Sequence, residues 1–178
     1  MYDGELSQAS INSAFKRPQR RSKRVFDYED RRIHILGSMK TNRLGVITRP
    51  IVVDASAELE IPFTNLERTL IDIVVRPTYA GGPRKILDAY AEARTRVNTE
   101  ELAGMLRELA YVYPYHQCIG YCMERAGYSS EQVAPLRALP RDFDFYLAHQ
   151  IDKPCFVPEW RLHVPQELEH GKAKRAMS

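Results

Sequence analysis

The chain has 178 residues, of which 44% are hydrophobic and 28% are charged, proportions that are ordinary for a globular domain. A chain of this length buries a core without disulfide bonds, and its three cysteines, Cys118, Cys122 and Cys155, cannot pair evenly. Because no signal peptide precedes them, we expect a reduced, cytoplasmic location. No apolar run approaches the roughly 20 residues of a membrane helix, so a membrane partner is not expected.

The net charge of +3 is unevenly distributed along the chain. Residues 16–24 (KRPQRRSKR) contain no acid and six cations, namely Lys16, Arg17, Arg20, Arg21, Lys23 and Arg24. Removing these six charges leaves the remaining residues at a net −3. We therefore expect residues 1–24 to form a basic N-terminal arm on a mildly acidic body.

The first part of the chain predicts one short helix and several strands. Residues 7–15 (SQASINSAF) place their apolar side chains on one face of a short helix. Alternation around a charged centre in residues 24–37 predicts a two-stranded hairpin. Residues 42–54, which are interrupted by Pro50, predict an edge strand or a pair of short strands. Residues 57–63 alternate again and predict a further strand.

After residue 64 the period of the hydrophobic residues changes from two to nearly four, which predicts helices. The expected helices cover residues 64–76, 82–97, 98–112, 115–127 and 129–138. Alternation returns in residues 141–150 and 159–165, which we expect to be late strands that rejoin the sheet. This order predicts an α+β fold, with a mixed β-sheet packed against a block of four to five helices. We expect a single domain over residues 25–165 and a flexible tail over residues 166–178.

The first helix of the block carries charges in an otherwise apolar sequence, TNLERTLIDIVVRPTYAGG. Thr64 and Glu67 have the spacing of a capping box, in which each side chain accepts the other residue's backbone amide. Arg68, Asp72 and Arg76 follow at a spacing of four and share one stripe of the helix. Asp72 precedes Arg76, which is the favourable order for an ion pair. Capping and pairing therefore explain every charge in this helix.

The alternative is a metal-dependent nuclease or nucleotidyltransferase-like enzyme that uses Asp72 or Glu67. Such an enzyme needs a second acid or a lysine at a useful spacing, and the sequence contains no Glu-x-Lys. The phosphate-binding loops GxxxxGK[ST] and GxGxxG are also missing. We therefore expect no catalytic residue and no cofactor.

The cysteines and tyrosines of residues 111–128 are the remaining candidates for chemistry or recognition. Cys118 and Cys122 lie four residues apart on a predicted helix, but a metal site would need further ligands from across the fold. We interpret Cys122 as a small buried residue of a core stripe and expect no metal. Tyr113 and Tyr115 either form a partner-binding surface or lie at the helix junction with satisfied hydroxyls. Tyr121 is expected in the core.

The basic segment is the strongest indication of a partner. Six cations in nine residues attract a polyanion, of which DNA is the usual one. Pro18 excludes a helix interior, and no aromatic residue is interleaved, so the segment would contact phosphates rather than bases. The alternative is a solvated run of charge without a partner.

Four stretches occur in a characteristic order: SQASINSAF, ERTLIDIVVRPTYAGG, YVYPYHQCIGYCMERAGY, and FDFYLAH with EWRLHVP. Together they resemble the AbiEi-type antitoxin family of type IV toxin–antitoxin systems. The resemblance covers about residues 6–165. The resemblance implies a prokaryotic, non-enzymatic regulator of an abortive-infection system. Such a protein neutralises a nucleotidyltransferase-like toxin and represses its own operon. Family members carry an N-terminal winged helix-turn-helix before a C-terminal α/β domain. Residues 1–24 do not supply a winged helix, so we expect this chain to correspond to the C-terminal domain, with its basic arm contributing to operator binding.

Overall fold

The structure, a computed structural model, describes residues 6–37, 41–54 and 57–170 and has the expected α+β fold. Its helices are α1 (Gln8–Phe15), α2 (Leu66–Val75), α3 (Pro83–Ala93), α4 (Thr99–Leu109), α5 (Tyr115–Arg125), α6 (Ser130–Arg137), α7 (Gln166–His170) and the 3-10 helix η1 (Pro158–Trp160). Its strands are β1 (Val25–Tyr28), β2 (Arg31–His34), β3 (Val46–Asp54), β4 (Ala57–Thr64), β5 (Phe145–Tyr146), β6 (Pro154–Val157) and β7 (Leu162–Pro165). None of the helices in these ranges has the length and apolar character of a membrane span.

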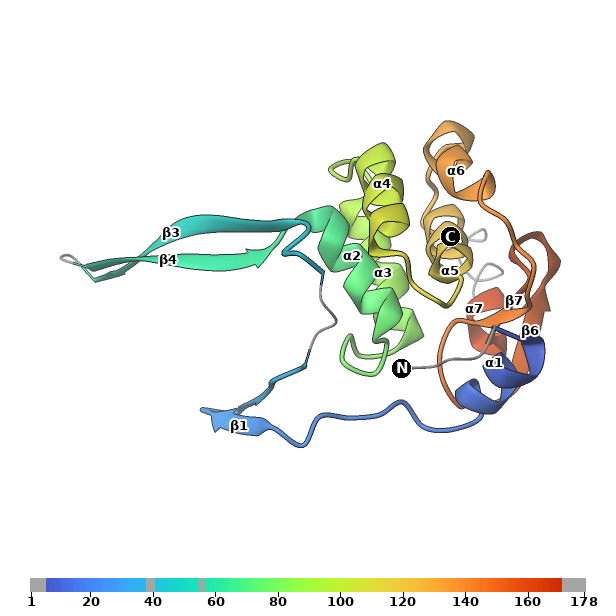
Figure 1. Ribbon diagram of the computed structural model, residues 1–178, viewed down its shortest axis with the longest axis horizontal. Coiled ribbons are helices and arrows are strands. Elements are labelled where there is room, and N and C mark those ends of the chain that lie inside the picture. Colours follow the sequence, from blue (N-terminus) through green and yellow to red (C-terminus); the bar gives the residue numbers. More distant parts are fainter. Residues whose placement is uncertain (1–5, 38–40, 55–56, 171–178) are drawn as a thin grey trace, which may run out of the picture.

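The strands form three small sheets rather than the single sheet that we expected. β1 pairs with β2 and β3 pairs with β4, each as an antiparallel hairpin, whereas β5, β7 and β6 form a separate three-stranded sheet. The last sheet is mixed, because β5 runs parallel and β6 antiparallel to β7. The two hairpins project from the helical block on the side away from the β5–β7–β6 sheet (Figure 1). The late strands therefore do not rejoin the early ones.

The core lies between the helices of the block and the three-stranded sheet. Each of α2 to α6 lies within the range expected from its hydrophobic period. The stretch from Gln117 to Met123 in α5 is wholly buried, and α5 packs against helices on one side and η1 on the other. Trp160 in η1 is fully buried against Gly120 of α5, and its indole nitrogen donates to the Glu124 carboxylate at 2.7 Å.

Both chain ends of the folded body extend further than the sequence indicated. α1 buries Ile11 and Phe15 in the core, so residues 8–15 belong to the body, and the arm begins only after them. α7 buries Leu168, so the expected flexible tail over residues 166–178 is wrong for its first five residues. These apolar side chains fix the two short helices on the β5–β7–β6 sheet, while residues 171–178 lie outside the described part of the chain.

Candidate nucleic-acid interface

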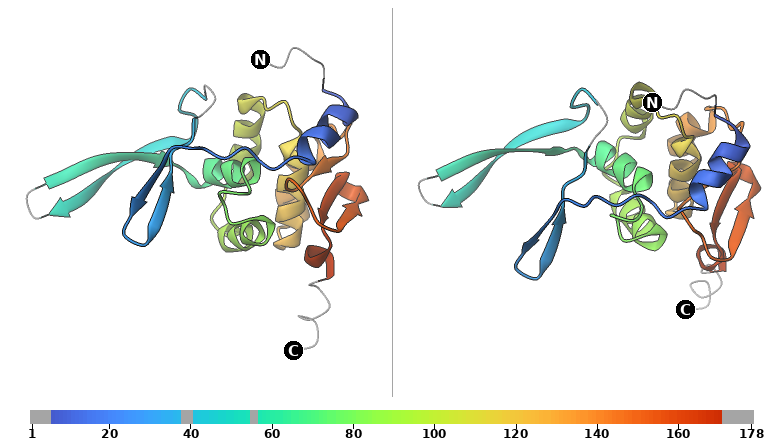
Figure 2. Two further views of the ribbon diagram at one scale, coloured as in Figure 1. Left: turned by 90° about the horizontal axis from the view of Figure 1, so that it is seen from below. Right: turned by 60° about the horizontal axis from the view of Figure 1, so that its bottom comes forward.

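The basic arm, defined here as residues 16–24, is an extended segment that joins α1 to β1. Figure 2 shows it crossing the molecule from α1 to the β1–β2 hairpin, past the end of the helical block. Its start is fixed because the Gln150 amide donates to the Phe15 carbonyl at 2.8 Å. In the middle, the Gln19 side chain donates to the Val75 carbonyl and accepts from the Thr78 amide, at 3.2 and 3.0 Å. The arm is therefore attached to the C-terminal end of α2.

The far end of the arm is attached through Ser22. Its amide donates to the Tyr79 hydroxyl at 2.6 Å, and its own hydroxyl donates to the Ile35 carbonyl at 2.5 Å. All of these anchors use uncharged groups. The cations between them remain exposed, and they are the six that the sequence analysis selected: Lys16, Arg17, Arg20, Arg21, Lys23 and Arg24.

None of these six cations forms an ion pair within the described residues. In the described ranges, the one hydrogen bond formed by these six side chains joins the Arg17 guanidinium to the Ser13 hydroxyl at 3.5 Å, the limit of a real bond. Exposed cations elsewhere, such as Lys85 and Arg96, are also unpaired in the described residues, so the arm is distinguished by its density of six cations in nine residues with no acid among them. An arm held in place by neutral residues, with its charges left for an external partner, has the properties of a polyanion-binding surface.

A recess of about 580 Å³ lies between the arm and the body. Arg20 and Arg21 line it from the arm, and Arg76, Tyr79 and His149 line it from the body. No carboxylate lines it among the described residues. The body thus adds cationic and hydrogen-bonding groups to the arm, as a site for phosphate oxygens requires. None of these three body residues was predicted for a site beside the arm, because they come from segments that only the fold brings next to it.

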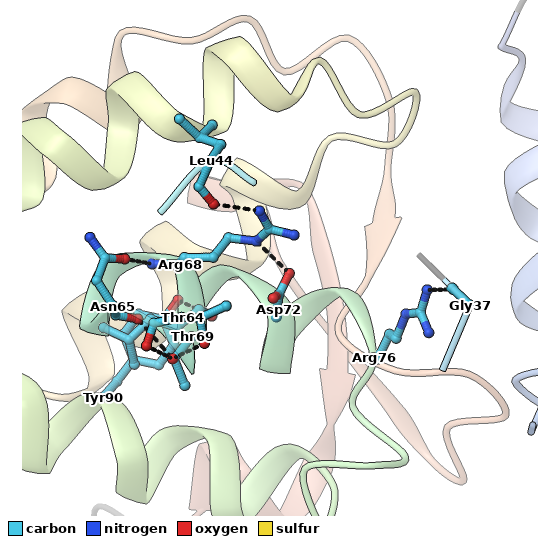
Figure 3. Close-up of polar contacts among 10 residues, drawn as sticks. Gly37, Leu44, Thr64, Asn65, Arg68, Thr69, Asp72, Arg76 and Tyr90 are labelled. Atoms are coloured by element: carbon cyan, nitrogen blue, oxygen red, sulfur yellow. Dashed lines mark hydrogen bonds and ion pairs between the residues drawn. The ribbon is translucent and has the colours of Figure 1, made fainter. Parts of the chain in front are cut away.

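Helix α2 holds the charges that raised the catalytic alternative. Arg68 is only 7% exposed, and its guanidinium donates to the Asp72 carboxylate at 2.9 Å and to the Leu44 carbonyl at 2.8 Å (Figure 3). Gly45 follows Leu44 with φ +70°, and a Cβ there would lie 2.7 Å from the Arg68 Cβ. The buried arginine therefore fixes the base of the β3–β4 hairpin to α2.

The expected capping box is wrong. The N-cap is Asn65, whose side-chain oxygen accepts from the Arg68 amide at 2.9 Å (Figure 3). The Thr64 hydroxyl instead lies 2.7 Å from that of Thr69. Glu67 is buried and accepts the Asn98 amide at 2.8 Å, which links α2 to the start of α4. Its carboxylate therefore serves a contact between helices rather than its own helix end.

The stripe of α2 charges is only partly paired as expected. The Arg68–Asp72 pair is present, but Arg76 donates to the Gly37 carbonyl at 3.0 Å instead of pairing with Asp72 (Figure 3). Arg76 is the C-cap residue and has left the helical conformation, with φ −131° and ψ 61°. Its side chain therefore no longer follows the stripe. Pro77 follows directly, so the predicted end of the helix is confirmed.

Two of the three cysteines lie in the interior, and Cys155 is half-buried. Cys118 and Cys122 are buried in α5, and burial raises the pKa of both thiols far above its usual value. The interpretation of Cys122 as a small core residue is confirmed. In the described part of the chain, no three His, Cys, Asp or Glu side chains are grouped as metal ligands. Neutral, enclosed thiols are poor nucleophiles, so these positions offer no covalent chemistry.

The tyrosine cluster lies at the junction of α4 and α5. Tyr113 and Tyr115 are half-buried, and both rings pack against Phe145, with centroids 5.8 and 5.5 Å away. They also line an open cavity of about 290 Å³. Tyr121 is fully enclosed, as expected, and its hydroxyl donates to Glu169 at 2.7 Å. Tyr113 and Tyr115 thus combine a packing role with partial exposure to solvent.

Comparison with protein-family models found no match, and comparison with curated proteins and with solved structures found none either. The candidate interface therefore rests on the geometry of the arm and its recess.

Proposed function

We propose that this chain is a domain of a prokaryotic, cytoplasmic antitoxin and transcriptional regulator of the AbiEi type. In this proposal it contributes to repression of its operon through DNA phosphates and neutralises a nucleotidyltransferase-like toxin. The observation that carries the DNA-binding part is the arm, whose six exposed cations have no acidic partner in the described residues and whose path is fixed by neutral anchors.

The charge distribution supports the same proposal. The arm and the recess beside it place Arg20, Arg21 and Arg76 around one hollow without a lining carboxylate in the described residues. Arginine is the residue best suited to bidentate contact with phosphate oxygens. Because these groups face the backbone of a nucleic acid, they would supply affinity and register rather than sequence readout.

The toxin contact belongs to a different surface in this proposal. Tyr113 and Tyr115 line the cavity at the α4–α5 junction, and the rings of both pack against the buried Phe145. Tyrosines that are fixed by packing lose little conformational entropy on binding and are enriched at protein interfaces. Exchanging both residues for alanine is expected to weaken toxin neutralisation and leave DNA binding unchanged.

The experiment that tests the DNA-binding part reverses four arm charges, with Arg20, Arg21, Lys23 and Arg24 changed to Glu. We expect this variant to bind a duplex of its own promoter much more weakly. The slope of log affinity against log salt concentration should become shallower by about one for each phosphate contact removed. The matched control reverses four exposed cations elsewhere, Lys85, Arg96, Arg107 and Lys153. Duplex affinity that is the same in both variants would exclude the arm as the DNA contact.

A further inference from the structure

The β1–β2 hairpin presents a face of aromatic, apolar and basic side chains that neither the arm nor the core explains. The strands pair Phe26 with Ile33 and Tyr28 with Arg31, so these four side chains share one face. Arg24 extends the same face, since the Ile35 amide donates to its carbonyl at 3.0 Å and continues the pairing. We call these five residues the hairpin face: Arg24, Phe26, Tyr28, Arg31 and Ile33.

The hairpin face points away from the body. Phe26 is 58% and Tyr28 62% exposed, and with the neighbouring Ile33, which is 50% exposed, they form a contiguous apolar patch. On the opposite face, His34 at the base of the hairpin contacts the body, with its ring 5.4 Å from that of Tyr79, whereas Asp27 and Arg32 are exposed. A two-stranded hairpin is marginally stable by itself in water, so leaving its aromatic side uncovered has a cost that a partner would offset.

We propose that the hairpin face binds a single-stranded nucleic acid, with bases stacked on Phe26 and Tyr28 and phosphates held by the adjoining arm. The inference rests on the proposed function for the phosphate contacts and adds the class of nucleic acid. The arm's cations lead directly into β1, so backbone contacts and stacking surface form one continuous strip. Combining a basic track with exposed rings is how proteins hold single strands without reading their sequence.

The spacing of the rings favours a single strand over a duplex. Alternate residues of a β-strand lie roughly 6.6 Å apart, whereas the bases of one duplex strand are stacked about 3.4 Å apart. Rings at about twice the stacking distance match bases that have been separated from one another. A duplex keeps its bases paired and stacked, and it would reach only the cations.

The acidic residues of the β1–β2 hairpin limit the path that a bound nucleic acid can take. Asp27 lies on the opposite face, 3.5 Å from Arg32. Glu29 and Asp30 occupy the turn, and Asp30 lies 3.9 Å from Arg31, so the charge of Glu29 leaves the tip negative. The positive potential is therefore highest at the base of the hairpin, beside Arg24 and Phe26, where the arm arrives. The nucleic acid is expected to cross the base rather than the tip.

The β3–β4 hairpin differs in these respects and serves as the internal comparison. Its apolar face carries Ile51 paired with Leu59, and its single aromatic ring, Phe63, is already covered by the Arg49 guanidinium, 6.0 Å from the ring centroid. Glu58 and Glu60 lie on its other face. With one aromatic ring in place of two, and with that ring paired with Arg49, this hairpin lacks the stacking surface that bases would need.

The test exchanges both rings for alanine, Phe26→Ala with Tyr28→Ala, and compares binding to a short oligothymidylate and to its duplex. Stacking on each ring contributes at least about fivefold to affinity, so single-strand binding should fall at least about thirtyfold. Duplex binding and the salt dependence should not change, because no cation is altered. The matched control, Ile51→Ala with Leu59→Ala, removes exposed apolar surface from the other hairpin and should change neither affinity.

A second variant gives a direct signal. The chain has one tryptophan, Trp160, which is fully buried and so provides a constant background. Phe26→Trp keeps the stacking surface, should bind oligothymidylate at least as tightly as the unaltered protein, and should show quenched fluorescence on binding. Quenching in this variant also reports on the site if the double alanine variant folds poorly.

The outcomes separate this inference from the proposed function. Unchanged single-strand affinity in the alanine variant, or equal losses for single strand and duplex, would overturn the stacking site. Loss of self-association with no change in nucleic-acid binding would also overturn it, by making the hairpin face a protein contact. The proposed DNA-binding role stands or falls separately, on duplex binding by the variant with reversed arm charges.

Discussion

Gly120 of α5 lies in direct contact with the indole ring of Trp160, and this contact joins the helical block to the segment that leads into β7. A Cβ at Gly120 would lie 2.0 Å from the ring carbon Cη2, and the ring is fully enclosed. We expect Gly120→Ala to lower the free energy of unfolding by about 1–3 kcal/mol, the usual cost of overpacking a core. Urea denaturation of the variant measures this loss.

A second helical glycine provides the control. Gly104 of α4 has no neighbouring atom within 4 Å of an added Cβ, so Gly104→Ala should stabilise the protein by up to about 1 kcal/mol through helix propensity alone. If both substitutions stabilised the protein equally, the contact between Gly120 and the indole ring would not exist in solution.

The ion pair between Arg68 and Asp72 is expected to stabilise the fold rather than perform chemistry. Asp72→Ala removes one partner of an arginine that is 7% exposed, and should cost about 1–3 kcal/mol of unfolding free energy. The control is Asp88→Ala, at an exposed position of α3, where little change is expected. A stable Asp72→Ala variant that had lost a Mg²⁺-dependent activity would reverse this assignment in favour of an enzyme.

Gln19 tests whether the fixed path of the arm contributes to DNA binding separately from its charge. Gln19→Ala removes the hydrogen bonds to Val75 and Thr78 but leaves every cation in place. Two hydrogen bonds contribute about 0.5–1.5 kcal/mol each, so we expect duplex affinity to fall by at least about fivefold, with an unchanged salt dependence. Trypsin should also cleave the released arm faster than the anchored one.

The control for this variant is Gln150→Ala, an exposed glutamine that holds the start of the arm through its backbone amide alone. Because the substitution keeps that amide, affinity and proteolysis should remain as in the unaltered protein. A reduced salt dependence in Gln19→Ala would mean that phosphate contacts, and not only their arrangement, depend on Gln19.

The burial of His116 leads us to expect that the protein is less stable in mild acid. Burial lowers the pKa of its imidazole, and a hydrogen bond to the backbone of Pro140 opposes the shift only in part. A histidine whose pKa is lowered on folding takes up a proton more readily in the unfolded chain. Stability should therefore be complete above the unfolded pKa of about 6.5 and decrease as the pH falls below it.

Thermal unfolding between neutral pH and mild acid measures this effect. His116→Gln removes the titrating group, so its melting temperature should depend less on pH than that of the unaltered protein. Some dependence should persist, because burial also lowers the pKa of His163. Identical pH profiles for the two proteins would exclude His116 as a source of the acid sensitivity.

The helical block could be predicted closely because a period near 3.6 is a local property of the sequence. Strand pairing is not local, and alternation in residues 141–150 does not indicate whether they join the early strands or form their own sheet. The α2 cap shows the same limit on a smaller scale. Thr64 and Asn65 are both good N-caps, and the choice between them follows the packing of Glu67 against Asn98, 31 residues away in sequence.

The candidate interface was likewise only partly predictable from the sequence. The six cations of residues 16–24 could be selected from composition alone, whereas Arg76, Tyr79 and His149 reach the recess only through the fold. The aromatic residues Phe26 and Tyr28 were assigned to a hairpin correctly, but the sequence could not show which of its faces would remain uncovered.

The arm is held at both ends, by α1 in the core and by the β1–β2 hairpin, and so it bridges two folded elements instead of hanging free. A free basic tail can search for phosphates at many distances and wrap around a groove. A bridge of this length spans at most about 30 Å, close to the 34 Å of one duplex turn. If the proposed DNA contact is right, the arm would therefore offer its charges over a fixed span of about one duplex turn and could not wrap further around the groove.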